Sequence, residues 1–171
     1  LVLVEHAHDA ATVLLSRGTP FFLAGEEMLR TKGGDSNSYA SSDAVNNLDW
    51  EALTPDSDEW AMARYYAGLI ALRRDRFENP DSPYGFLTEL QPTAAWQDDG
   101  TIRVTWAEDD ASVAYAVLNP WNRPLTCEAP EGWTAYTVAV SGDQVTPDAA
   151  PTEGSFRAEP ISLTLIVRQD P

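Results

Sequence analysis

Apolar residues in the first part of the chain recur with the spacing of a helix. Along residues 1–17 they return at intervals of three and four, which places them on one face of a helix. The residues on this face are Leu3, Ala7, Ala10 and Leu14. Gly18 follows, at the place just beyond a helix C-terminus where glycine is common. The pattern predicts a helix that buries one side.

A short, continuous apolar run comes next. After Thr19 and Pro20, residues 21–24 read Phe-Phe-Leu-Ala, which is typical of a strand buried on both faces. Residues 25–57 are then rich in Gly, Ser, Asn and Asp, a composition that predicts a loop. A loop of this length inside a compact domain usually has a function. We therefore expect a buried strand that leads into a functional loop.

A second helix is predicted from Ser57 or Asp58 onward. Acidic residues stand at its start and arginines at its end, which suits the helix dipole at both termini. Its apolar face consists of Met62, Tyr66, Leu69 and Ile70. Residues 79–83 contain two prolines and read as a linker.

Beyond residue 84 the apolar period changes to two, which predicts strands. Turn signals rich in Asp, Asn, Gly and Pro separate the alternating runs. The runs are residues 95–97, 102–106, 112–118, 136–140 and 161–167. Several short strands this close together favour a small antiparallel β-sandwich. The order of elements predicts the tail of one domain, residues 1–83, followed by a complete second domain, residues 84–171.

Charge and composition exclude several classes of partner. The 171 residues carry a net charge of −16, so nucleic acid and anionic membrane surfaces are not expected partners. No apolar run reaches membrane-spanning length. Cys127 is the single cysteine, and His6 and His8 do not share a helix face, so neither a disulfide within the chain nor a metal site is predicted.

The first residue is a leucine inside the predicted helix, with no capping residue before it. We therefore expect the chain to be part of a longer protein. A signal peptide could precede it there, so the sequence leaves the localisation unknown between secreted and cytoplasmic.

One motif resembles a known enzyme family. Residues 18–39 read GTPFFLAGEEMLRTKGGDSNSY, and residues 46–50 read NNLDW. This motif resembles type I pullulanases, α-1,6-glucan debranching enzymes of the α-amylase superfamily (glycoside hydrolase family 13), in which it follows the eighth barrel strand. Residues 65–74 are similar to the eighth barrel helix of that family. Residues 112–120 and 161–167 resemble strands of its C-terminal β-sandwich.

The resemblance implies an α+β fragment: the last helix-strand-helix portion of a TIM (β/α)8 barrel followed by a C-terminal antiparallel β-sandwich. The implied full-length enzyme is a retaining glycoside hydrolase that cleaves α-1,6 branch linkages in pullulan, starch or glycogen-derived dextrins. Its α-glucan substrate is the expected partner. No organic cofactor is implied, and a calcium ion is compatible with the full-length enzyme.

The catalytic residues are expected to lie outside this chain. In the family, the nucleophile, the acid and the stabilising carboxylate follow the fourth, fifth and seventh barrel strands. Residues 1–9, which end in His8 and Asp9, superficially resemble the seventh-strand signature. Only ten residues separate Asp9 from Thr19–Pro20, too few for the crossover helix that parallel strands need. We therefore predict no catalytic residue here and an inactive fragment.

Six loop residues are candidates for substrate binding. They are Glu26, Glu27, Arg30, Asp35, Asn37 and Tyr39. Each has an alternative structural role. Adjacent carboxylates on an extended chain point opposite ways, so Glu26 and Glu27 cannot both act on one bond. Arg30 could bind sugar hydroxyls or pair with Asp35 or Asp49.

The turn-forming side chains and the tryptophans leave alternatives open too. Asp35, Asn37 and Tyr39 suit sugar hydroxyls, while Asn and Asp also form turns with their own backbone. Trp50 is expected to be buried rather than to stack on sugar. In the β region, alternate aromatics usually form core, although exposed ones could bind glycan. These residues are Trp96, Trp106, Trp121 and Trp133.

Two rival functions remain at this point. An isoamylase-type or α-amylase-type hydrolase would share the architecture and differ in the linkage it cleaves. A non-catalytic carbohydrate-binding or structural module is the other alternative. A partial barrel would also leave Phe21, Phe22 and the apolar helix faces uncovered, so we expect the fragment to self-associate or to pack on missing barrel residues.

Overall fold

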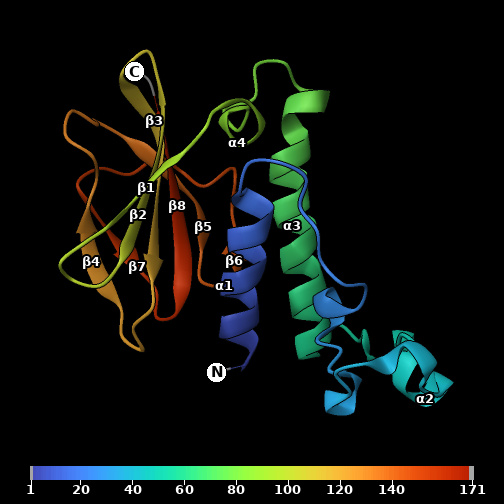
Figure 1. The fold of residues 1–171 in the computed structure, drawn as a ribbon. Coiled ribbons are helices and arrows are strands. Elements are labelled where there is room, and N and C mark those ends of the chain that lie inside the picture. The colour runs from blue at the N-terminus through green and yellow to red at the C-terminus, as the bar shows by residue number, and fades with distance from the viewer. Residues whose placement is uncertain (1, 170–171) are drawn as a thin grey trace.

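The computed structural model describes residues 2–169 as a mixture of helices and antiparallel sheet (Figure 1). Two long helices, α1 (Val2–Leu15) and α3 (Asp58–Glu78), run side by side next to a twisted six-stranded sheet. Both predicted helices are confirmed. Ser57 is the N-cap of α3, and its hydroxyl accepts a hydrogen bond from the amide of Trp60 at 3.1 Å.

One arginine ties the two helices together. The guanidinium of Arg73 in α3 donates to the carbonyls of Leu14 at 2.9 Å and Ser16 at 2.7 Å, and also to that of Gly18. The last carbonyls of a helix have no partner within it, and they carry its negative dipole end. Arg73 therefore caps the C-terminal end of α1 and holds it against α3.

Residues 19–24 do not form the expected buried strand. They pair with no strand among the described residues, and Phe21 is 88% exposed. Phe22 turns inward, against Tyr66 of α3, with ring centroids 5.3 Å apart. A strand exists only where neighbouring strands accept its backbone hydrogen bonds, and residues 2–169 offer it none. The prediction of burial on both faces is therefore wrong.

Residues 25–57 form the predicted loop, which contains short helical turns. These are 3₁₀ turns at Glu26–Met28, Lys32–Gly34, Ser38–Ala40 and Trp50–Ala52, and the short helix α2 at Asp43–Asn46. The sequence did not predict helix α4 (Phe86–Glu89), which follows the linker after α3. Phe86 and Leu87 bury their side chains there, so α4 belongs to the core.

The β region forms two antiparallel sheets. The larger has the strand order β1-β2-β3-β8-β5-β6, and the smaller consists of β4 and β7. The strands are β1 (Thr93–Trp96), β2 (Ile102–Glu108), β3 (Ala111–Asn119), β4 (Leu125–Glu128), β5 (Tyr136–Ser141), β6 (Gln144–Val145), β7 (Ser155–Ala158) and β8 (Ser162–Arg168). The five predicted runs correspond to β1, β2, β3, β5 and β8, while β4, β6 and β7 escaped prediction.

The two faces of the large sheet bury different partners. On one face Leu165 and Trp106 pack with the helices, in a cluster that includes Leu14 and Leu69. On the other face the β4–β7 sheet covers Tyr136 and its neighbours. β8 supplies both clusters, so six of its seven residues are buried. Since the first cluster joins both sides of the predicted boundary at residues 83 and 84, that division stays a prediction.

The helix faces are not left open. Met62, Leu69 and Leu72 of α3 are each no more than 2% exposed, because the sheet and α1 cover them. The prediction of uncovered helix faces is therefore wrong, whereas Phe21 is exposed as expected. None of the helices within residues 2–169 combines the length and apolar character that a membrane crossing needs.

Three tryptophans contradict the prediction of burial. Trp50 is 66% exposed, Trp96 is 76% exposed and Trp121 is 44% exposed. Trp106 is buried as expected, and the half-buried Trp133 donates its indole hydrogen to Ser112 at 2.9 Å. Trp96 lies in the edge strand β1, where fewer neighbours remain to cover a large ring, and Trp50 and Trp121 lie outside the strands.

Candidate functional site

The candidate site begins where Gly25 turns the chain out of the extended segment. Gly25 has φ 99°, a conformation that favours glycine. Its carbonyl accepts a hydrogen bond from the amide of Arg30 at 2.9 Å, and its amide donates to the Glu27 carboxylate at 2.9 Å. Both hydrogen bonds join residues of the same turn, so the Glu27 carboxylate stabilises the start of the loop.

Arg30 lies against this turn. A Cβ built on Gly25 would come within 3.0 Å of the Arg30 side chain, so only glycine leaves room for it. One terminal nitrogen of Arg30 donates to the carbonyl of Asn46 at 3.0 Å, and its buried Nε has no hydrogen-bond partner within residues 2–169. The alternative of an ion pair with Asp35 or Asp49 is not what the structure shows. Arg30 instead joins the start of the loop, at Gly25, to Asn46 farther along it.

A cluster of hydrogen bonds stabilises the middle of the loop. The side-chain amide of Asn46 donates to the carbonyls of Ser38 at 2.7 Å and Ser41 at 3.1 Å. Lys32 donates to the hydroxyl of Ser38 at 2.7 Å. Ser38 is buried although its neighbours are exposed. Sequence reasoning missed Lys32 and Ser38, because nothing local distinguishes a buried serine from the exposed serines around it.

The Asp35 side chain forms hydrogen bonds within the loop. Its carboxylate accepts hydrogen bonds from the hydroxyl of Ser41 and from the amide of Asn37, the latter at 3.0 Å. These bonds, with that of Ser41 the stronger, lower the pKa of Asp35 below its ordinary value. The turn-forming alternative therefore describes Asp35 well. Tyr39, by contrast, is 90% exposed.

Glu26 and Glu27 lie near a buried phenol. Burial is the main cause that raises the pKa of Tyr66 to about 12, and the negative charge of nearby carboxylates adds to it. These carboxylates belong to Glu26, Glu27 and Asp9. Asp9 lies inside α1 (Val2–Leu15), which confirms the predicted helix over those residues. The fold thus gathers three acidic side chains from α1 and the loop around Tyr66.

A cavity of about 330 Å³ opens between the two halves of the loop. Of the six candidate residues, Arg30 lines it and the other five do not. The structure therefore divides the candidates into three groups: Arg30 in the cavity, Glu26 and Glu27 near Tyr66, and the turn that contains Asp35, Asn37 and Tyr39. Within residues 2–169, His, Cys, Asp and Glu side chains form no group of three or more that could hold a metal ion.

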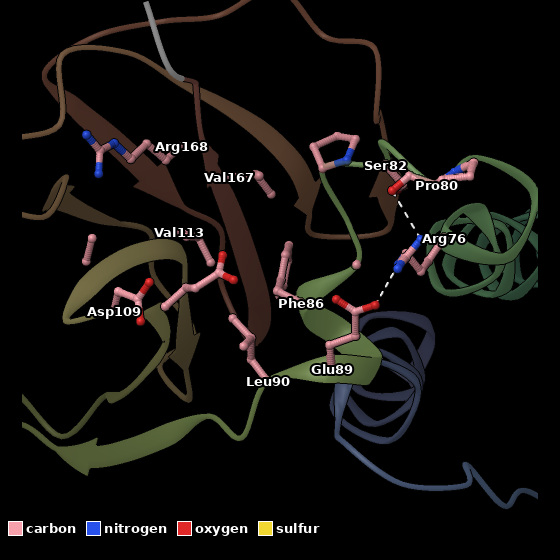
Figure 2. Close-up of a pocket in the computed structure, with 14 residues that line it drawn as sticks. Arg76, Pro80, Ser82, Phe86, Glu89, Leu90, Asp109, Val113, Val167 and Arg168 are labelled. Atoms are coloured by element: carbon pink, nitrogen blue, oxygen red, sulfur yellow. Dashed lines mark hydrogen bonds and ion pairs between the residues drawn. The ribbon is translucent and has the colours of Figure 1, made fainter.

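A second cleft, of about 500 Å³, lies where the helices meet the sheet (Figure 2). Arg76 of α3 and Glu89 of α4 point toward each other across its edge, 2.6 Å apart, and Arg76 also donates to the carbonyl of Pro80 at 3.1 Å. Phe86 and Val113 line the same cleft. None of the six candidate residues lies there, so we treat this cleft as a seam between α4 and the β2–β3 hairpin.

The chain matches curated debranching enzymes in sequence. A glycogen debranching enzyme from Dickeya chrysanthemi is 31% identical over 156 residues, which cover 90% of this chain and 21% of that protein. A pullulanase from Bacillus subtilis (strain 168) is 43% identical over 65 residues, which cover 38% of this chain and 9% of the pullulanase. The chain spans about a fifth of the length of the relatives that match most of it. No family model matches the chain.

A solved structure has the same fold. The pullulanase from Bacillus acidopullulyticus superposes with a TM-score of 0.75 at 24% identity, over 98% of this chain and 20% of that chain. The fold and the sequence matches together show a chain that is similar to one portion of polysaccharide-debranching enzymes. Within that class, the chain is a homologue of the glycogen debranching enzymes and pullulanases. The resemblance seen in the sequence is confirmed.

Proposed function

We propose that this chain is the C-terminal part of a debranching enzyme that hydrolyses α-1,6 branch linkages in pullulan, starch or glycogen-derived dextrins. Its relatives are named glycogen debranching enzyme and pullulanase, which supports the linkage. A pullulanase from Anoxybacillus sp. LM18-11, with a TM-score of 0.74 to this chain, was solved in complex with maltotetraose. This complex supports an α-glucan as the substrate.

One observation carries the proposal. Residues 20–24 are apolar and pair with no strand within residues 2–169, and they connect α1 toward α3, two helices that pack side by side. Strands on both sides would pair the backbone groups of this segment and cover its apolar side chains. We assign it as the last strand of a (β/α)8 barrel that the longer enzyme completes, with residues 1–83 as the end of the barrel and 84–171 as the terminal β-domain.

The loop after this strand would then lie at the C-terminal end of the barrel, where active sites form. Asn37 and Tyr39 are exposed there and suit contact with sugar hydroxyls and sugar rings. Glu26 would contact substrate or a catalytic neighbour. Arg30, Asp35 and Glu27 would act mainly by holding the loop, because their polar groups are engaged within it.

The bond-breaking step would come from residues outside this chain. A retaining glycosidase needs a nucleophile and an acid placed close together on either side of the scissile bond. We assign both to earlier barrel strands of the longer enzyme. The isolated chain is then inactive, and its loop supplies part of the sugar-binding surface.

The first test uses the 171-residue chain alone. Incubated with pullulan, it should release no reducing ends, whereas the longer enzyme should release linear oligosaccharides by cleaving α-1,6 links. Hydrolysis by the isolated chain would overturn the assignment of the catalytic residues. Products of α-1,4 cleavage from the longer enzyme would favour an amylase-type hydrolase instead.

The second test concerns the loop. In the longer enzyme, Asn37→Ala and Tyr39→Ala should each raise KM for pullulan roughly tenfold, since each removes a contact worth about 1.4 kcal/mol. Ser36→Ala is the matched control, because Ser36 is exposed in the same turn. Unchanged kinetics in both variants would show that this turn does not contact substrate.

A further inference from the structure

Two exposed tryptophans lie at one turn of the β region. Residues 97–101 connect β1 to β2, and Trp96 stands directly before them. Trp121, from the segment after β3, packs its ring against Gly100 of the same turn. Trp96 is 76% exposed and Trp121 is 44% exposed. Tryptophan is highly buried on average, so two exposed tryptophans at one turn require an explanation.

Trp121 is rigidly held. Its indole nitrogen donates to the carbonyl of Asp99 at 2.8 Å, and a Cβ on Gly100 would lie 2.7 Å from the ring, so only glycine fits beneath it. Its backbone is fixed on both sides: its amide donates to the side chain of Asn119 at 3.0 Å, and its carbonyl accepts from Ile161 at 3.0 Å. A ring held in this way loses little entropy when a ligand stacks on it.

The turn under the ring is rigid as well. The carboxylate of Asp99 accepts hydrogen bonds from the amide and the hydroxyl of Thr101, at 2.9 and 2.6 Å. It also pairs with Arg103 at 3.0 Å. The hydrogen bond to Thr101 is the main cause that lowers the pKa of Asp99. The carbonyl of Asp99 is therefore fixed where the indole needs it.

Trp96 lacks cover because of its place in the sheet. It pairs with Ile102 at the end of β1, which is the edge strand, and all four residues of β1 are exposed. The sheet offers the indole one neighbouring strand and no covering layer. Trp96 therefore presents a broad apolar face to solvent beside the turn that also carries Trp121.

We propose that Trp96, Trp121 and the turn of residues 97–101 form a second α-glucan-binding surface. The turn lies at the opposite side of the molecule from the loop of residues 25–57 (Figure 1). Indole rings stack on the apolar faces of sugar rings, and the neighbouring polar side chains of Gln97 and Asp98 suit the hydroxyls at the sugar edges. The net charge of −16 disfavours an anionic ligand, and stacking rings beside polar side chains suit a neutral polyhydroxyl chain. The choice of an α-glucan among such chains rests on the proposed function.

The test is a titration of the 171-residue chain with maltotetraose, followed by the six indole N–H signals in the NMR spectrum. Signals of Trp96 and Trp121 should shift together, with a dissociation constant on the order of 1 mM. Trp96→Ala should weaken this binding roughly tenfold. Trp121→Phe keeps a ring but loses the bond to Asp99, and should weaken binding as well. Circular dichroism checks that both variants fold.

Trp50→Ala is the matched control. Trp50 is 66% exposed on the loop, so its loss should leave the shifts of Trp96 and Trp121 unchanged. Equal affinity in the Trp96→Ala chain, or the absence of shifts at Trp96 and Trp121, would overturn the proposal. So would a concentration-dependent dimer that Trp96→Ala abolishes, because the surface would then bind a second copy.

The two proposals fail in different ways. If the debranching assignment is wrong but the surface binds glucan, the longer enzyme will not cleave α-1,6 links, yet Trp96 and Trp121 will still shift. Cellotetraose serves as the comparison ligand of different linkage. Stronger shifts with cellotetraose than with maltotetraose would contradict the assignment of an α-glucan.

Discussion

Single side chains decide the shape of the candidate site. Asn46 joins the carbonyls of Ser38 and Ser41, and Arg30 reaches from Gly25 to Asn46. The residue types were visible in the sequence, but their partners were not. The sequence suggested Asp35 or Asp49 as the partner of Arg30, whereas in the fold Arg30 donates to the backbone carbonyl of Asn46. Several residues selected as sugar ligands thus prove to hold the loop together.

Gly68 shows how one missing side chain can bring two elements close together. A Cβ at this position would lie 2.9 Å from Cβ of Val145 in β6. Gly68→Ala should therefore destabilise the chain by about 1–3 kcal/mol, although alanine is favoured by about 1 kcal/mol in a helix. Urea unfolding measures the difference. Val145→Ala should relieve the clash in the double variant, and a more stable Gly68→Ala chain would contradict this packing.

Buried tyrosines should make the chain sensitive to alkali. Burial raises the pKa of Tyr66 and Tyr84 to about 12 and also raises that of Tyr65. A raised pKa in the folded state means that this stability is fully present below the ordinary value near 10 and is lost as the pH rises toward 12. Absorbance of tyrosinate at about 295 nm should rise together with the loss of circular dichroism. Ionisation of these residues in a chain that stays folded would contradict the prediction.

At the scale of elements, contacts between helices and sheet determine what is buried. Arg73 fastens α3 to the end of α1, and the sheet covers the apolar faces of both helices. The same sheet leaves β1 at its edge, so Trp96 is exposed although its strand was predicted correctly. Burial therefore follows from the position of an element among its neighbours.

Adjacent arginines in α3 provide a matched pair. Arg73→Ala leaves the carbonyls of Leu14 and Ser16 without their charged donor and should cost about 2 kcal/mol of unfolding free energy. Arg74 pairs with Glu78 at 2.7 Å on an exposed surface, so Arg74→Ala should cost below about 0.5 kcal/mol. Thermal unfolding of both variants tests the difference. Equal losses of unfolding free energy would show that the hydrogen bonds of Arg73 to α1 contribute no more than the exposed ion pair of Arg74.

At the scale of the whole molecule, the chain combines covered helices with one uncovered segment. Phe21 is 88% exposed and Leu23 is 47% exposed. An unpaired segment with two large exposed apolar side chains resembles a strand whose neighbouring strands are missing. This exposure supports the proposal that a larger barrel surrounds the segment.

We infer that the isolated chain self-associates through this segment. Light scattering should give a mass above the 18.8 kDa of one chain, rising with concentration. Phe21→Ser should lower the mass because it removes apolar surface, and Phe21→Leu, which keeps that surface, should not. A monodisperse monomer at all concentrations would contradict the inference.

The sequence by itself determined the elements with strong local patterns and the family motif. Helices α1 and α3, the loop of residues 25–57 and five strands follow from periodicity, capping and turn residues, which act between near neighbours along the chain. Only the tertiary structure decided that residues 19–24 lie unpaired, that Trp50, Trp96 and Trp121 face solvent, and that Arg30 bonds to Asn46. Burial and pairing depend on segments that are distant in sequence, and a local pattern carries no information about which neighbours are present.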